Sequence, residues 1–156
     1  MTNYLSKPIL INIASLLYCL IPLALLTGPF FPDLFLSIIV IIFLLLVIRD
    51  REYDLFFSKF SLVFGIFWLY LLFNSLLSDF PYFSIKSSLV YFRFGIFVLA
   101  TIYILKHKED FLKKFTFIFI FTYCFALIDG FYQFIFGTSL FGYDNIHLIR
   151  LNLPFN

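Results

Sequence analysis

Five apolar runs, each close to the roughly 20 residues that a helix needs to cross a bilayer, divide the chain between clusters of charged residues. Water-soluble domains carry about one quarter charged residues, because they need a polar shell. Here only 13% of the 156 residues are charged and 63% are hydrophobic. The sequence therefore predicts an all-α, polytopic membrane protein in contact with the lipid bilayer. We expect one transmembrane bundle over residues 1–136, with spans at about 9–26, 30–48, 60–77, 85–105 and 115–136.

Basic residues between the runs predict the orientation, because cytoplasmic loops are enriched in Lys and Arg. If the N-terminus is cytoplasmic, the basic residues on that side number eight: Lys7, Arg49, Arg51, Lys59, Lys106, Lys108, Lys113 and Lys114. The other side then carries two, Lys86 and Arg150. This asymmetry predicts a cytoplasmic N-terminus and an extracytoplasmic C-terminus, with residues 137–156 beginning an extracytoplasmic loop.

The sequence contains no features typical of several classes of function. The net charge of +2 is small and scattered, so nucleic acid is not an expected partner. Cys19 and Cys124 lie in separate apolar runs and predict no disulfide. His107 and His147 have no second ligand at metal spacing, so no metal and no other cofactor is expected. The sequence contains no phosphate-cradling glycine loop and no serine nucleophile elbow, and the catalytic residues stay unknown.

Arg93 is the one charged residue inside the run from residue 88 to residue 105. It lies eight residues past Ile85, so at 1.5 Å per residue its depth in the span is roughly 12 Å. An arginine at the centre of a span costs about 2.5–3.5 kcal/mol on insertion scales, and a partner, a water-filled cavity or snorkelling reduces this cost. Intramembrane charges of this kind are candidates for functional sites.

Asp129 is the partner that helical geometry predicts. It lies seven residues before Phe136, at a depth of roughly 10 Å, and spans four and five are joined by a short loop. We therefore expect these two helices to be antiparallel neighbours with an Arg93–Asp129 ion pair. Lys86, seven residues before Arg93, shares its helix face, and Gln133 shares a stripe with Asp129. These residues predict an outward-opening polar cleft; a pair that only fastens two helices is the alternative.

The stretch "DGFYQFIFGTSLFGYD", residues 129–144, resembles the end of the span that precedes the large periplasmic loop in the O-antigen ligase and polymerase family. The upstream "KSSLVYFRFGIF", the loop "KHKED" and the downstream "RLNLPF" occur in an order similar to that family. The resemblance covers roughly residues 74–155.

The resemblance implies a membrane glycosyltransferase of the bacterial inner membrane that works without a metal. Such enzymes transfer or polymerise a glycan linked to undecaprenyl diphosphate, at the periplasmic face, with an acceptor such as lipid A core. Family arginines hold the diphosphate, so the implied substrate-binding residues are Arg93, Lys86 and Arg150. A histidine of the large loop serves the transfer, so this chain is expected to be an N-terminal portion, inactive alone.

Two other functions stay open at this point. One is a transporter or flippase module in which an Arg93–Asp129 pair gates a polar path. The other is a small membrane protein that acts by packing against partner helices.

Reporter fusions test the predicted orientation. A reporter enzyme that is active only outside the cytoplasm should be active after Lys86 and after Asn156, and inactive after Asp54 or Lys108. A cytoplasmic result at Asn156 would contradict the five-span arrangement.

Overall fold

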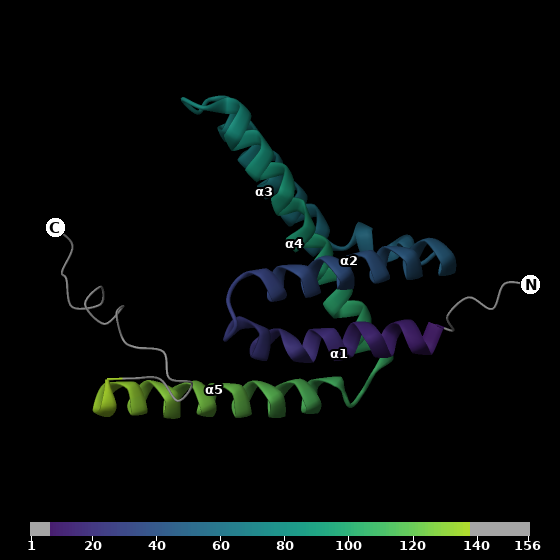
Figure 1. Cartoon of the computed structure of the whole chain (residues 1–156). Helices are drawn as coiled ribbons and strands as arrows, with labels where there is room; N and C mark the ends of the chain where they lie inside the picture. The colour runs from purple at the N-terminus through teal and green to yellow at the C-terminus, as the bar shows by residue number, and fades with distance from the viewer. Residues whose placement is uncertain (1–6, 138–156) are drawn as a thin grey trace, which may run out of the picture.

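The computed structural model describes residues 7–137, and these form an all-helical chain without strands (Figure 1). The helices are α1 (Lys7–Leu25), α2 (Phe30–Asp50), the short 3-10 helix η1 (Tyr53–Phe57), α3 (Lys59–Leu76), α4 (Pro81–His107) and α5 (Phe111–Phe136). All five α-helices are long and apolar enough to cross a membrane. The predicted all-α class and the five apolar helices are confirmed, and they identify a multi-pass membrane protein.

Local sequence explains where the helices begin and end. Gly28, with a φ of 114°, precedes Pro29 and makes the turn from α1 to α2. Ser58 caps α3, because its side-chain oxygen accepts a hydrogen bond from the backbone N–H of Ser61 at 3.2 Å. Pro81 stands at the start of α4, where its missing N–H leaves no helical bond unmade.

The core lies where α1, α2 and the C-terminal half of α4 meet the start of α5. Its largest fully buried side chains are Tyr103, Phe111, Ile39, Leu46 and Val47. Tyr18 of α1 stacks on Phe97 of α4 with ring centroids 5.0 Å apart, and it meets Phe111 edge-on at 5.2 Å. Aromatic contacts therefore join three helices in one cluster.

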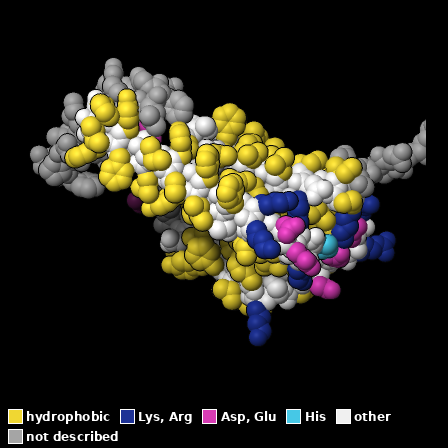
Figure 2. Space-filling view, turned by 90° about the horizontal axis from the view of Figure 1, so that it is seen from below, with side chains coloured by type: hydrophobic (Ala, Val, Ile, Leu, Met, Phe, Trp, Pro, Cys, Tyr) yellow, Lys and Arg dark blue, Asp and Glu magenta, His cyan; other side chains and the backbone are white. Residues whose placement is uncertain are grey.

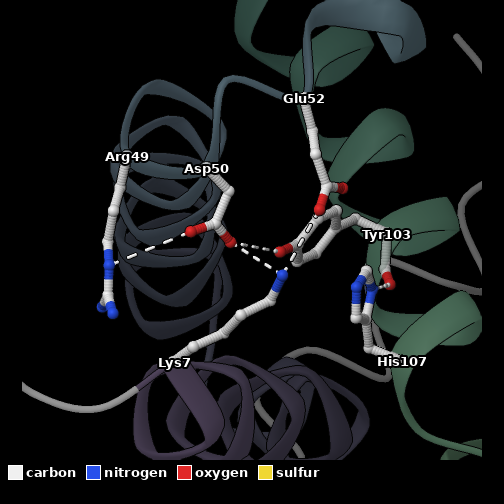
Figure 3. A network of polar contacts seen from close by, with 6 residues as sticks. All are labelled: Lys7, Arg49, Asp50, Glu52, Tyr103 and His107. Atoms are coloured by element: carbon white, nitrogen blue, oxygen red, sulfur yellow. Dashed lines mark hydrogen bonds and ion pairs between the residues drawn. The ribbon is translucent and has the colours of Figure 1, made fainter.

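A network of charged and aromatic side chains closes one end of this core (Figure 3). Lys7 of α1 pairs with Asp50 at the end of α2, with Nζ 2.7 Å from Oδ2, and also reaches Glu52 at 3.3 Å. The Tyr103 hydroxyl of α4 donates to Asp50 at 3.5 Å, and His107 Nδ1 lies 2.9 Å from the Tyr103 carbonyl oxygen. We call this side of the molecule the charged end.

Lys, Arg, Asp and Glu side chains gather at one end of the face in Figure 2, and the coloured side chains elsewhere on this face are mostly hydrophobic. The loops that carry most of the basic residues therefore lie together in space, as a membrane protein with one basic side requires. Which side of the membrane this end faces stays a prediction.

Helices α3 and α4 form a hairpin that leans away from the α1–α2 pair (Figure 1). Trp68 of α3 donates its indole N–H to the Ser88 carbonyl of α4 at 2.9 Å, and the Ser75 and Ser88 hydroxyls are hydrogen bonded to each other. Ser75 is the one buried residue of α3. The N-terminal half of α4 thus packs on α3, and its C-terminal half enters the core.

Helix α5 runs along α1 and leaves α4 soon after the loop that joins them (Figure 1). The prediction that the fourth and fifth helices are antiparallel neighbours is wrong for this structure. Tyr18 explains the choice, because its ring contacts both Phe111 and Phe115 at the start of α5 and holds α5 against α1. Beyond this contact α5 is mostly exposed, with Phe111 and Thr122 its buried residues.

Gly95 of α4 sets how closely α3 can approach. A Cβ atom at this position would overlap the ring of Phe64, so Gly95→Ala should lower the thermal unfolding temperature in detergent, with a loss of about 1–3 kcal/mol. Gly65→Ala on α3 is the matched control, because no atom lies near its Cβ position, and it should leave stability equal or higher. Equal losses in both variants would contradict the close α3–α4 contact; adding Phe64→Leu to Gly95→Ala should restore part of the stability.

Candidate functional site

The side chain of Arg93 in α4 forms a two-pronged ion pair with Asp33 in the first turn of α2. Nη1 of Arg93 donates to Oδ2 of Asp33 at 2.9 Å, and Nη2 donates to Oδ1. A planar guanidinium matches a carboxylate in this geometry, and the pairing fixes orientation as well as charge. The pair therefore joins α4 to α2 at the end of α2 that lies far from the charged end.

The sequence favours an acidic residue at this place in α2. Pro32 and Asp33 fall in the first turn of the helix, where backbone N–H groups have no helical acceptor and the helix dipole favours a negative charge. Asp33 thus interacts with the helix N-terminus and with Arg93 at once. Its side chain is 49% exposed and that of Arg93 30% exposed, so the pair lies open at the protein surface.

The third nitrogen of the guanidinium, Nε of Arg93, is buried and has no hydrogen-bond partner in the described residues 7–137. The Phe94 ring lies under the guanidinium, with its centroid 5.2 Å from Cζ. Two of the three nitrogens are therefore occupied by Asp33, and one is without an acceptor.

The expected ion pair between Arg93 and Asp129 is wrong, because Asp33 holds Arg93. Asp129 lies on α5 and accepts a hydrogen bond from the Gln133 side-chain amide at 2.6 Å. The prediction failed because it placed α5 beside α4, whereas α5 packs on α1. The shared polar cleft of Arg93, Lys86, Asp129 and Gln133 accordingly does not form in the described residues.

The structure describes one of the other two predicted cations. Lys86 is exposed on α4, two helical turns before Arg93. Arg150 lies outside the described residues. Of the three predicted substrate-binding residues, the structure therefore places Arg93 and Lys86 on one helix, seven residues apart.

A cleft lined by hydroxyl groups opens between α3 and α4, in the half of the hairpin that carries Lys86. Its volume is about 440 Å³, and its lining residues are Leu71, Asn74, Ser75, Ser78, Phe83, Ser84, Ser87 and Ser88. We call it the serine cleft. Ser84 donates to Ser78 at 2.9 Å, and Ser75 donates to the Leu71 carbonyl at 2.8 Å. Polar side chains from both helices thus face one space.

Sequence reasoning missed Asp33 and the serines of α4. Asp33 is the one acidic residue in the run 30–48, and an unpaired cation elsewhere in the membrane should have directed attention to it. Ser84, Ser87 and Ser88 follow helical spacings of three and four residues, which signals one polar face. The spacing of residues along α4 does not show that these faces meet α2 and α3.

Chemically, this region offers fixed cations and hydroxyl groups. No group of three His, Cys, Asp or Glu side chains that could hold a metal ion occurs in residues 7–137. Guanidinium and ammonium groups bind phosphate oxygens, and hydroxyl and amide groups bind sugars or backbone.

Comparison with known proteins found no match: no family model, no curated protein and no solved structure is similar to this chain.

A double-mutant cycle tests the Arg93–Asp33 pair. Arg93→Ala or Asp33→Ala alone leaves one charge in a membrane helix without its partner. Each single variant should therefore lose more than half of the thermal stability that the double variant loses. We expect a coupling energy of about 0.5–2 kcal/mol, because the pair is partly exposed.

The control cycle uses Arg93→Ala with Asp129→Ala. These residues do not pair, so their effects on unfolding temperature should add. Coupling in the control cycle and additivity in the Asp33 cycle would contradict the observed pairing.

Proposed function

We propose that this chain is a membrane-embedded part of a glycosyltransferase that uses a glycan linked to undecaprenyl diphosphate, with Arg93 and Lys86 as phosphate-binding cations. The activity of the whole enzyme is transfer or polymerisation of the glycan at the extracytoplasmic face of the bacterial inner membrane. The sequence resemblance supplies the reaction.

The observation that carries the proposal is the position of Arg93 in the structure. Its guanidinium lies at the surface of the helical bundle, close to the start of α2, and Lys86 lies two turns before it on α4. A lipid diphosphate has its charge at the level of the lipid head groups and its chain among the helices. Two cations on one membrane helix, Lys86 near its start and Arg93 deeper in the span, suit such a molecule.

Asp33 neutralises Arg93, and this pairing stabilises a guanidinium in a membrane helix. A diphosphate carries more acceptor oxygens and more charge than one carboxylate, so we propose that it displaces Asp33 from the guanidinium. Nε of Arg93, which has no partner within residues 7–137, then adds a third donor.

The serine cleft supports the glycan part of the proposal. Asn74 and Ser87 line it and are exposed, and the Phe83 ring lies at the same cleft. Hydroxyl and amide groups beside an aromatic ring form the kind of surface that binds sugars, through hydrogen bonds and contact with the ring face. We assign the first sugars of the donor to this cleft.

A second candidate function is assembly with partner helices, and one observation favours it. Apolar side chains cover most of α3 and α5, among them Phe67, Phe73, Phe117 and Phe134, each more than half exposed. Partner helices could cover these faces in place of lipid. In that function the Arg93–Asp33 pair only fastens α2 to α4.

Donor binding distinguishes the two functions. Arg93→Lys keeps the charge but loses the paired planar donors, so it should weaken binding of undecaprenyl diphosphate to the protein in nanodiscs by roughly tenfold or more. Thermal stability measured beside it should change less than in Arg93→Ala. Wild-type affinity in a well-folded Arg93→Ala variant would rule out the donor role.

The Asp33→Asn variant distinguishes a role of the Arg93 site in donor binding from a role in holding α2 against α4. Removing the competing carboxylate should tighten donor binding if the diphosphate replaces Asp33, even though the helix contact is weakened. Asp129→Asn removes an acid of α5 and should leave donor affinity unchanged. Equal donor affinity in wild type and Asp33→Asn, with lower stability in the variant, would support the fastening role.

A further inference from the structure

A second cavity lies between α1 and α5 near the charged end, at a distance from the region around Arg93. Its volume is about 670 Å³, within the range of small-molecule sites. The residues that line it are Asn12, Ser15, Leu16, Cys19, Lys108, Phe111, Lys113, Lys114, Phe117 and Ile118. Asn12, Ser15 and Cys19 follow one another at spacings of three and four residues and so share one face of α1.

One part of the cavity wall is cationic. Lys113 and Lys114 are exposed in the first turn of α5, where the helix dipole also favours an anion. Lys108 donates to Asn12 Oδ1 at 2.8 Å and to Ser15 Oγ at 2.6 Å. Both acceptors are neutral, so they hold the ammonium group of Lys108 against α1 without neutralising its charge.

Acidic groups near these lysines do not close ion pairs with them. Glu109 and Asp110 are neighbours in the loop, and both are exposed. Within residues 7–137, none of Lys108, Lys113 and Lys114 forms a salt bridge, in contrast to Lys7, which pairs with Asp50 and Glu52. Three cations therefore face a cavity with a net positive potential, and a ligand with a negative charge complements it.

The remaining wall is apolar. Leu16 and Phe117 are exposed along the cavity, Ile118 lies beside them, and Cys19 and Phe111 form the buried floor. A small inorganic anion would make no favourable contact with this apolar wall. A molecule with an anionic head and a hydrocarbon chain fits both parts, because the head meets the lysines and the chain covers the apolar residues.

We propose that this cavity binds a membrane lipid with an anionic phosphate head group. The phosphate is held by Lys113 and Lys114 with Lys108 behind them, and one acyl chain lies against Leu16, Phe117 and Ile118. The predicted orientation places this end at the cytoplasmic leaflet, where anionic lipids attract basic residues next to the membrane. The proposal does not depend on the glycosyltransferase function, because it uses another cavity and other residues.

Lipid retention tests the proposal with phosphatidylglycerol as the probe and phosphatidylcholine as the neutral lipid. In detergent, native mass spectrometry should show that the protein binds phosphatidylglycerol more tightly. Each lysine near the membrane contributes roughly a fivefold factor in affinity, so the double variant Lys113→Gln/Lys114→Gln should lose roughly 25-fold. A steric variant, Leu16→Trp, keeps all charges and should also lose binding, because its ring fills the apolar part from an exposed position.

The matched control is Lys59→Gln/Lys106→Gln, which removes two lysines from the same predicted side of the membrane, neither of which lines the cavity. It should keep its phosphatidylglycerol affinity. Equal losses in both double variants would mean general surface attraction and would overturn the site, as would equal binding of the two lipids. Inorganic phosphate at the same concentration should not displace the lipid; full displacement would show a phosphate site without a lipid chain and would also overturn the proposal. Unfolding temperatures of all variants show that each is folded.

Discussion

Polar contacts and close packing between helices hold this protein together, because the hydrophobic effect gains little in a membrane. Lipid tails are as apolar as a leucine side chain, so burying leucine against another helix replaces one apolar neighbour with another. A polar group in hydrocarbon has no such alternative and needs a partner. The structure places a polar contact at each helix junction that matters: Arg93–Asp33 between α4 and α2, Ser75–Ser88 between α3 and α4, Lys108–Asn12 between the α4–α5 loop and α1, and Lys7–Asp50 between α1 and α2.

These contacts divide the molecule into two regions of different chemistry. At the charged end, the network around Asp50 pairs with Lys7 and joins α1, α2 and α4, while the lysines beside the α1–α5 cavity form no salt bridge within residues 7–137. Far from that end, Arg93 is paired and hydroxyl groups of the α3–α4 hairpin face a cleft. Paired charges fasten helices, and charges without a carboxylate partner attract ligands. For these reasons we propose a lipid as the ligand of the first region and, with Asp33 as a displaceable partner, a diphosphate as the ligand of the second.

The loose packing of α3 and α5 is consistent with a part of a larger assembly. Each of these helices buries few residues, whereas α2 buries seven along its length. Lipid or partner helices can cover the exposed faces.

The sequence by itself determined the class of the protein, the number of apolar helices and the approximate extent of each, with α4 and α5 beginning four residues earlier than expected. Those features depend on local properties: hydropathy over about 20 residues, Gly28 and Pro29 at a turn, and charge between the runs. It also identified Arg93 as a residue that needs a partner. Only the tertiary structure decided that the partner is Asp33 and not Asp129, that α5 lies on α1, and that Lys108 reaches Asn12. In a helix that is apolar on nearly all sides, no hydrophobic stripe marks which face meets which neighbour. The neighbours are chosen by a few polar and aromatic contacts between residues far apart in the chain, and such pairs cannot be read from spacing along one helix.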